Sequence, residues 1–174
     1  MDEPLSSLDA KLRSELRLQL KRLQADLGAT FLYVTHDQIE AMTMATHVGV
    51  LDEGKLVQFG TPREIYENPN SVYVASRLGL PRINTLPANL VNSAPDNAAT
   101  IGLRPEHILV NTASDAMRME ARVNRIESLG DQTRLHLSVA DQAVVTLVDP
   151  HTGLNKGDSV NICLLYTSPS PRDS

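Results

Sequence analysis

The chain has 174 residues, of which 41% are hydrophobic and 21% charged, and its formal net charge is −5. This length and composition are typical of one ordinary or two small soluble globular domains, and they argue against a disordered chain. The acidic balance disfavours non-specific nucleic-acid binding, and no apolar run reaches the length of a membrane-spanning helix. The single cysteine, Cys163, rules out an internal disulfide, and no secretory signal is recognisable, so these features together indicate a cytoplasmic protein.

The first predicted element is an amphipathic helix that begins after Ser7 or Asp9, either of which is a suitable cap, and ends at Gly28. Leucines recur along it at spacings of four, four, three and four residues, which places them on one helical face. They are Leu12, Leu16, Leu20, Leu23 and Leu27. We therefore expect this face to pack on a core.

A short strand and a polar loop are predicted next. Residues 31–34 form an apolar run typical of a strand buried on both faces of a parallel sheet. His36 follows this run, and Asp37 opens a second helix with Glu40 in a capping-box position. Ligands bind at the carboxyl ends of strands in open α/β sheets, so His36 occupies a ligand-contacting position. The local pattern alone is also compatible with a histidine at a helix start that is satisfied by backbone groups.

The next segment predicts a β-hairpin and two short helices. Residues 48–51 and 56–59 form the two arms, joined by a turn that carries Gly54. Pro62 starts a helix capped by Thr61, with Glu64 as the capping-box partner, and 71–79 reads as another short helix.

The second half predicts a small all-β domain. Residues 81–97 are rich in Pro, Asn and Ser and are interpreted as a connector. Six strand-like runs follow, separated by turn signals, which favours a small barrel or sandwich. They lie at 99–104, 107–110, 120–130, 133–140, 143–149 and 159–165. Basic and aromatic residues do not interleave here, so nucleic-acid binding is not expected. His107, His136 and His151 lack metal-ligand spacing and are read as surface or turn residues.

Three stretches resemble a known family. MDEPLSSLDAKLR, YVTHDQIEAMTMA and VLDEGKLVQFGTPREIYENPNSVYVASRLG occur in an order and at separations similar to those of ABC-transporter ATP-binding subunits of the maltose and glycerol-phosphate importer type. IGLRPEHILV and ESLGDQTRLHL resemble the regulatory, TOBE-type domain of the same group, an OB-like barrel. The similarity extends through about Leu164, and it implies a carboxyl-terminal fragment that begins at the acidic pair of the Walker B motif.

The resemblance implies a role for each matching residue. Asp2 would help hold Mg²⁺ through a water molecule, and Glu3 would polarise the water that attacks the γ-phosphate of ATP. His36 would be the switch histidine that contacts this phosphate, and Asp9 would lie in the loop that crosses to the partner subunit. These residue types suit phosphoryl transfer, which depends on positioning and charge neutralisation. Without the other motifs, Asp2 and Glu3 would be read as a solvated acidic terminus, and Asp9 as a helix cap, which is compatible with its loop role.

Several parts of the family pattern are absent from the chain: the GxxxxGK[ST] phosphate loop, the Q-loop glutamine, the LSGGQ signature and the aromatic residue that stacks on adenine. We therefore expect this chain alone neither to bind ATP well nor to hydrolyse it. The resemblance implies that the first half of the nucleotide-binding domain precedes Met1 in the complete protein.

The predicted organisation is an α/β part at 1–80, from the end of the P-loop ATPase domain, then an OB-like barrel at 81–164. Residues 165–174 are predicted to be a non-native tail that resembles translated adapter sequence, or else a disordered natural terminus. The resemblance implies an ATPase that drives import of sugars or related solutes. It would act as a homodimer on membrane permease subunits at the cytoplasmic face, with an external solute-binding protein. A standalone dimerisation or binding module and a non-functional truncated product remain alternatives.

Overall fold

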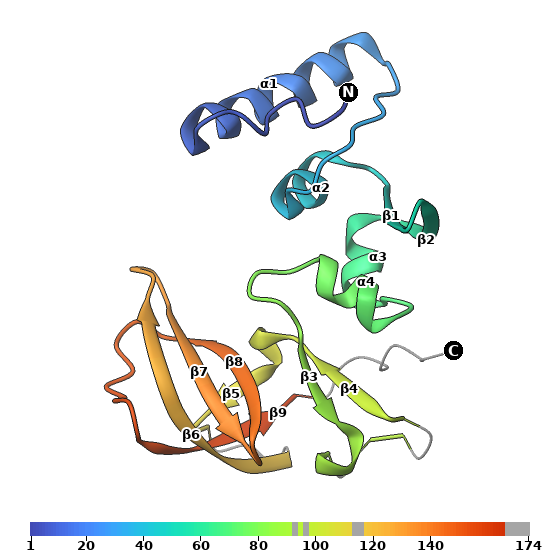
Figure 1. Cartoon of the computed structure of the whole chain (residues 1–174). Coiled ribbons are helices and arrows are strands. Elements are labelled where there is room, and N and C mark those ends of the chain that lie inside the picture. The colour runs from blue at the N-terminus through green and yellow to red at the C-terminus, as the bar shows by residue number, and fades with distance from the viewer. Residues whose placement is uncertain (92–93, 96–97, 113–116, 166–174) are drawn as a thin grey trace. The chain divides into compact units, whose positions relative to one another are not determined.

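The computed structural model describes residues 1–91, 94–95, 98–112 and 117–165. The chain divides into two compact units, Met1–Tyr66 and Glu67–Ser174 (Figure 1). Among the helices of the described ranges, none combines the length and apolar character needed to cross a membrane. The predicted tail falls outside the described residues except for Leu165, and the predicted domain boundaries at 80 and 164 stay predictions.

The first unit contains helices and one hairpin. Its elements are α1 (Ala10–Leu27), α2 (Gln38–Met44), β1 (Val48–Asp52), β2 (Lys55–Gly60) and α3 (Pro62–Glu67). The predicted first helix is confirmed, and its cap is Asp9, whose carboxylate accepts a hydrogen bond from the Leu12 N–H. Gly28 ends α1 with a φ of 56°, in the left-handed region that favours glycine.

The leucine face of α1 was predicted to pack on a core. Among the described residues it does not, so this prediction is wrong. No residue of α1 is buried, and Leu27 is 63% exposed to solvent. The 3.6-residue periodicity identified the apolar face correctly, but burial also requires an opposing surface, and the described residues provide none.

The strand predicted at 31–34 is also not formed. Only Val34 makes a β-bridge, a parallel one to Asp2, and Leu32 is 81% exposed. A strand buried on both faces needs neighbouring strands and covering helices, which this unit does not supply. The α/β class of residues 1–80 therefore stays a prediction.

The hairpin and the capping box of α3 are confirmed. Strands β1 and β2 pair antiparallel, with Asp52 opposite Lys55 around a two-residue turn in which Glu53 and Gly54 have φ values of 45° and 77°. Positive φ at both positions is the geometry of a type I′ hairpin turn. Before α3, the Thr61 N–H donates to Glu64 Oε2 at 2.8 Å, while the Glu64 N–H donates to Thr61 Oγ1 at 3.2 Å.

Within its described residues, the second unit is mostly β, with one α-helix and two 3₁₀ turns. It contains α4 (Val72–Arg77), β3 (Asn84–Pro87), η1 (Ala88–Leu90), β4 (Thr100–Leu103), η2 (Pro105–His107), β5 (Ile108–Val110), β6 (Met117–Ser128), β7 (Thr133–Val139), β8 (Gln142–Val148) and β9 (Ser159–Leu164). All six predicted strand segments are present. They include a five-stranded antiparallel sheet in the order β5-β9-β6-β7-β8, beside which β3 pairs with β4 (Figure 1).

Residues 84–91 correct the predicted connector. Asn84–Pro87 form strand β3, and Leu86 and Val91 are buried in the core of this unit. The prolines suggested a loop, but Pro87 is the last residue of a two-stranded ladder, a position where a missing N–H costs little. The barrel therefore begins earlier in the chain than its strand-like runs indicated.

Two buried polar side chains close the sheet toward a barrel. Asn84 Nδ2 donates to the Val145 carbonyl at 2.8 Å, and the Val145 N–H donates to Asn84 Oδ1 at 2.7 Å, so the amide pairs with the edge of β8 as a peptide group would. Thr146 Oγ1 lies 2.7 Å from the Ile108 carbonyl, which links β8 to β5. The two edge strands of the five-stranded sheet thus meet, in keeping with an OB-like barrel.

A single hydrophobic core fills this unit. Its fully buried members come from all seven strands of this unit and include Leu86, Ile101, Ile108, Val123, Leu135, Val144 and Ile162. Arg104 is 5% exposed, and its guanidinium donates to the carbonyls of Ala75, at 3.0 Å, and Leu78. It thereby satisfies carbonyls at the carboxyl end of α4 and ties that helix to the barrel.

Candidate functional site

The structure brings together two of the residues singled out by sequence, Glu3 and His36. The Glu3 N–H donates to the Val34 carbonyl at 2.8 Å, and the Val34 N–H donates to the Met1 carbonyl at 2.9 Å. This parallel bridge pairs Asp2 with Val34 and so aligns residues 1–3 with residues 33–35, directly before His36. His36 Nε2 then lies 2.7 Å from Glu3 Oε2, so a carboxylate and an imidazole separated by 33 positions form one pair.

Glu3 has an uncommon backbone conformation. Its φ is 41°, within the left-handed region that residues with a Cβ rarely adopt. Such conformations cost on the order of 1–3 kcal/mol and are concentrated at functional sites. The Glu3 side chain is 34% exposed and that of His36 is 78% exposed, so this pair can be reached from solvent.

A buried carboxylate supports the loop that carries His36. Glu40 is 3% exposed, and its Oε2 accepts hydrogen bonds from Thr35 Oγ1 at 2.6 Å and from the Tyr33 hydroxyl at 3.0 Å. Glu40 was expected to close a capping box with Asp37. Instead, the Asp37 N–H donates to Thr35 Oγ1 at 3.0 Å, because Glu40 turns toward the loop before the helix.

Asp37 caps α2 and joins it to α1. Its Oδ1 accepts from the backbone N–H groups of Ile39 and Glu40, and its Oδ2 accepts from Arg13 Nη1 at 3.2 Å. Burial alone would raise the pKa of this carboxyl, but the backbone donors, Arg13 and the charge of Arg17 together hold the pKa below its ordinary value. Asp37 is therefore a stable anion at neutral pH.

Tyr33 supplies the second hydroxyl group that donates a hydrogen bond to Glu40. Burial, followed by the hydrogen bond to Glu40 and the charge of that carboxylate, raises the pKa of Tyr33 to about 12. The phenol therefore keeps its proton and acts as a donor throughout the neutral range.

The remaining predicted residues lie nearby in the chain but have different local surroundings. Asp2 is exposed and joins the bridge to Val34 through its backbone. Asp9 uses its side chain to cap α1. In the part of the chain that the structure describes, no three His, Cys, Asp or Glu residues are grouped as a metal site. A single carboxylate with water is nevertheless a usual protein contribution to Mg²⁺ held mainly by phosphates.

Sequence reasoning missed Thr35, Glu40 and Arg13 as parts of this site. Thr35 and Glu40 are five residues apart across the start of a helix, and the capping-box pattern gave Glu40 another partner. Arg13 reaches Asp37 across 24 positions, and its Nη2 also donates to the Leu8 carbonyl at 2.9 Å. The placement of a basic residue outside the leucine stripe of α1 was the available signal, but it did not identify the acceptor.

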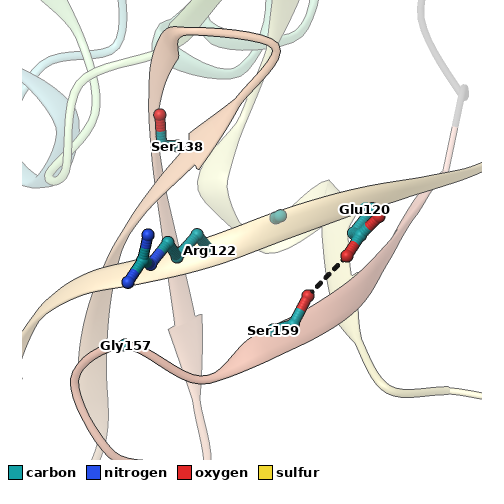
Figure 2. A pocket seen from close by; sticks show the side chains of 6 residues that line it. Glu120, Arg122, Ser138, Gly157 and Ser159 are labelled. Atoms are coloured by element: carbon teal, nitrogen blue, oxygen red, sulfur yellow. Dashed lines mark hydrogen bonds between the residues drawn. The ribbon is translucent and has the colours of Figure 1, made fainter.

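The barrel surface also carries an open hollow of about 420 Å³, lined partly by Glu120, Arg122, Ser138 and Ser159. Figure 2 shows that Glu120 and Ser159 face each other across β6 and β9, and Ser159 Oγ donates to Glu120 Oε1 at 2.7 Å. On the neighbouring hairpin, His136 Nε2 lies 3.4 Å from Glu127 Oε1, so His136 is a partly buried strand residue rather than the surface or turn residue expected from sequence.

Comparison with known proteins identifies relatives for both units. A TOBE domain model matches residues 101–166. The chain is 40% identical over 167 residues to the sn-glycerol-3-phosphate import ATP-binding protein UgpC 2 of Rhizobium johnstonii, covering 92% of the chain and 48% of that relative. It is 45% identical over 152 residues to UgpC of Rhizobium meliloti, covering 80% of the chain and 44% of the relative. The expected resemblance to importer ATP-binding subunits is confirmed.

These matches also set the extent of the similarity. UgpC of Psychromonas ingrahamii is 41% identical over 184 residues, a region that covers 92% of the chain and 49% of that protein. The chain thus spans about half the length of the curated relatives it matches, and it corresponds to their carboxyl-terminal part.

Proposed function

From homology to the carboxyl-terminal halves of ABC import ATP-binding proteins, we propose that this chain supplies that half of an importer ATPase subunit. The complete protein would hydrolyse ATP to drive uptake of a sugar, a glycerol phosphate or a related solute. The observation that carries the proposal is the 2.7 Å contact between His36 Nε2 and Glu3 Oε2. It joins the two side chains expected to act on the same phosphate and the same water.

The roles of this pair follow from their chemistry. A carboxylate such as Glu3 accepts a hydrogen bond from a water and increases its nucleophilicity, and it is partly exposed to solvent. The imidazole of His36 can donate its N–H either to the carboxylate or to a phosphate oxygen as charge develops there. Pairing them fixes the direction of the Glu3 carboxylate, so a water bound to it would be held in one orientation.

Asp2 and Asp9 complete the proposed site. Asp2 precedes Glu3 on the bridged segment and would hold Mg²⁺ through a water molecule, while the metal would neutralise phosphate charge. Asp9 already fixes the start of α1, which would give the loop between Glu3 and α1 a defined shape for contact with the partner subunit. ATP itself would need donors from the amino-terminal half, because a phosphate loop supplies the backbone N–H cradle.

The assembly proposed for the complete protein is a homodimer of ATP-binding subunits on two permease subunits. It would sit peripherally at the cytoplasmic face of the membrane and receive solute from an external binding protein. Support comes from the names of the relatives, which describe import ATP-binding proteins.

The test joins this chain to the amino-terminal half of the Rhizobium meliloti relative and measures ATP hydrolysis by the purified chimera. The variant Glu3→Gln should reduce the rate by about 10²–10⁴-fold, the usual contribution of a general base. Glu15→Gln, on the exposed surface of α1, is the matched control and should retain the rate. Wild-type hydrolysis by the Glu3→Gln chimera would exclude the proposed role, and hydrolysis by the 174-residue chain alone would contradict its expected inactivity.

A second candidate function, a standalone dimerisation module, is favoured by the location of the core. All the buried residues of the continuous cluster lie between Leu86 and Leu164, within the second unit. Sedimentation of the whole chain and of residues 67–165 would test it. Dimers formed by both would support the module, whereas two monomeric species would exclude it.

A further inference from the structure

Both neighbours of His36 are held by side-chain hydrogen bonds that lead to one buried group. We propose that Glu40 is a positioning residue for the His36–Glu3 pair and that it acts through the hydroxyl of Thr35. This inference rests on the proposed function for its importance in ATP hydrolysis, but the positioning itself can be measured without ATP. Neither the capping pattern nor the roles implied by family resemblance assigns Glu40 this task.

Burial is the first reason to assign Glu40 a specific role. A carboxylate that is 3% exposed loses most of its contact with water, which is costly unless hydrogen bonds replace it. Glu40 is not needed as the cap of α2, because Asp37 fills that position with its own side chain. Its hydrogen-bonding capacity is directed instead to the segment just before the helix.

The order of donors explains how Glu40 can act at a distance. A threonine hydroxyl has one proton, and Thr35 gives it to Glu40 Oε2 at 2.6 Å. With its proton so directed, Thr35 Oγ1 presents lone pairs to the Asp37 N–H at 3.0 Å. One continuous chain of hydrogen bonds thus runs from Asp37 through Thr35 to Glu40 and closes the turn in which His36 is the central residue.

The other end of this turn is fixed by backbone contacts. Val34 accepts from the Glu3 N–H at 2.8 Å and donates to the Met1 carbonyl at 2.9 Å. His36 therefore lies between an anchored Val34 and an anchored Asp37, and its ring can reach Glu3 only if the turn keeps its shape. Tyr33 donates to the same oxygen of Glu40 at 3.0 Å, but it is not part of the path to Asp37.

The test uses NMR on the full 174-residue chain. One readout is the nuclear Overhauser effect between the His36 ring and the Glu3 side chain, and the other is hydrogen exchange of the Asp37 amide. Thr35→Val keeps the shape of the side chain but removes the hydroxyl. We expect it to abolish the Overhauser effect and to accelerate Asp37 exchange by up to about tenfold, the effect of losing one hydrogen bond.

Conservative variants separate positioning from general destabilisation. Thr35→Ser restores the hydroxyl and should restore both readouts. Glu40→Gln keeps a side-chain oxygen that can accept both donors and should also retain the Overhauser effect, whereas Glu40→Leu should abolish it. Tyr33→Phe removes the donor outside the path and should leave the Asp37 amide protected. Unchanged exchange at the Val34 amide shows that the bridge to residues 1–3 survives in each variant.

Three results would overturn the inference. The first is an Overhauser effect between His36 and Glu3 that persists in both Thr35→Val and Glu40→Leu. The second is its continued absence in Thr35→Ser, and the third is its absence in Glu40→Gln. These outcomes differ from failure of the proposed function, which would appear as a Glu3→Gln chimera with undiminished ATP hydrolysis, even where the NMR readouts behave as expected.

Discussion

Strand β7 and helix α1 both carry strong apolar periodicity, yet only the strand buries its apolar side chains. Along β7, Leu135, Leu137 and Val139 are each at most 1% exposed. Along α1, no residue is buried, and Leu23 retains 47% of its exposure. The strand pairs with β6 and β8 in one sheet. The helix, in contrast, is linked to the rest of its unit by side-chain hydrogen bonds such as that from Lys21 to the Thr43 carbonyl.

The contrast teaches that periodicity reports which face of an element favours burial but not whether the same chain provides the covering surface. Burial stabilises by about 25 cal/mol for each square ångström of apolar area removed from water. The second unit obtains that stabilisation from a continuous core. The first unit relies more on helix caps, a turn and side-chain hydrogen bonds, each of which contributes on the order of 1 kcal/mol.

The most direct test of this difference truncates one aliphatic side chain of the same size to alanine in each unit. Ile162 in β9 is fully buried, and Ile162→Ala should destabilise the barrel by about 2–5 kcal/mol. Leu23, in the leucine face of α1, is 47% exposed, and Leu23→Ala should change stability by less than about 0.5 kcal/mol. Urea titration followed by hydrogen exchange in β9 and α1 separates the two units. Equal losses in both would show that the leucines of α1 are buried in solution.

A second test concerns the polar closure of the barrel. Asn84→Ala leaves the N–H and carbonyl of Val145 without their side-chain partner in a partly buried position. Each unsatisfied group costs about 1–3 kcal/mol, so we expect a total loss of about 2 kcal/mol or more.

The matched control for this substitution is Thr85→Ala, at the next, exposed position of β3. It should leave the urea midpoint of the barrel nearly unchanged. A similar small effect of Asn84→Ala would mean that β8 does not depend on the Asn84 amide for its edge pairing.

A third test examines the local interactions of the first unit. Gly54 has a φ of 77°, and an added Cβ would meet no atom within 4 Å, so Gly54→Ala reports backbone strain alone. The expected cost is about 1–2 kcal/mol, seen as faster hydrogen exchange in β1 and β2. Glu53→Asn, at the other turn position with positive φ, should be neutral or stabilising, because asparagine tolerates this conformation. Slower exchange in Gly54→Ala would contradict the type I′ turn.

Local sequence patterns correctly predicted the elements that depend on residues close together in the sequence. The caps at Asp9 and Thr61, the turn at Gly54 and the strands of the barrel all follow from side chains close in sequence, and all are confirmed. Residues 84–91 were misread because their prolines and asparagines are typical of loops. The partner of Asn84 lies 61 positions away, so no window along the sequence reveals it.

The candidate site shows the same limit. Glu3 and His36 were identified by family resemblance, and their proximity depends on one parallel bridge that a sequence pattern does not display. Glu40 had a plausible local role as a capping-box partner, and this concealed its contacts with Tyr33 and Thr35. Polar networks depend on side-chain directions and on burial, and neither property can be read from spacing alone.

The smallest expected effect is that of low pH on α2, through protonation of the Asp37 carboxylate that caps this helix. Its pKa in the folded state lies below the ordinary value of 3.8, so its ionised form stabilises α2 above that value. This stabilisation is lost as the pH falls through the lower, folded-state pKa. Because a partly exposed ion pair contributes about 1 kcal/mol or less, the change should appear only as faster hydrogen exchange of the Ile39 and Glu40 amides under strongly acidic conditions.

Asp37→Asn isolates the charge from the cap, because asparagine also accepts from the first N–H groups of a helix. At neutral pH the variant should lose only the contribution of the ion pair with Arg13. Its α2 amides should then exchange with little dependence on this acid transition, while β9 exchange stays equal in both proteins. If acid accelerates α2 exchange equally in the variant and the wild type, another carboxylate controls this unit. Glu40, with its hydroxyl partners Tyr33 and Thr35, is then the carboxylate to substitute next.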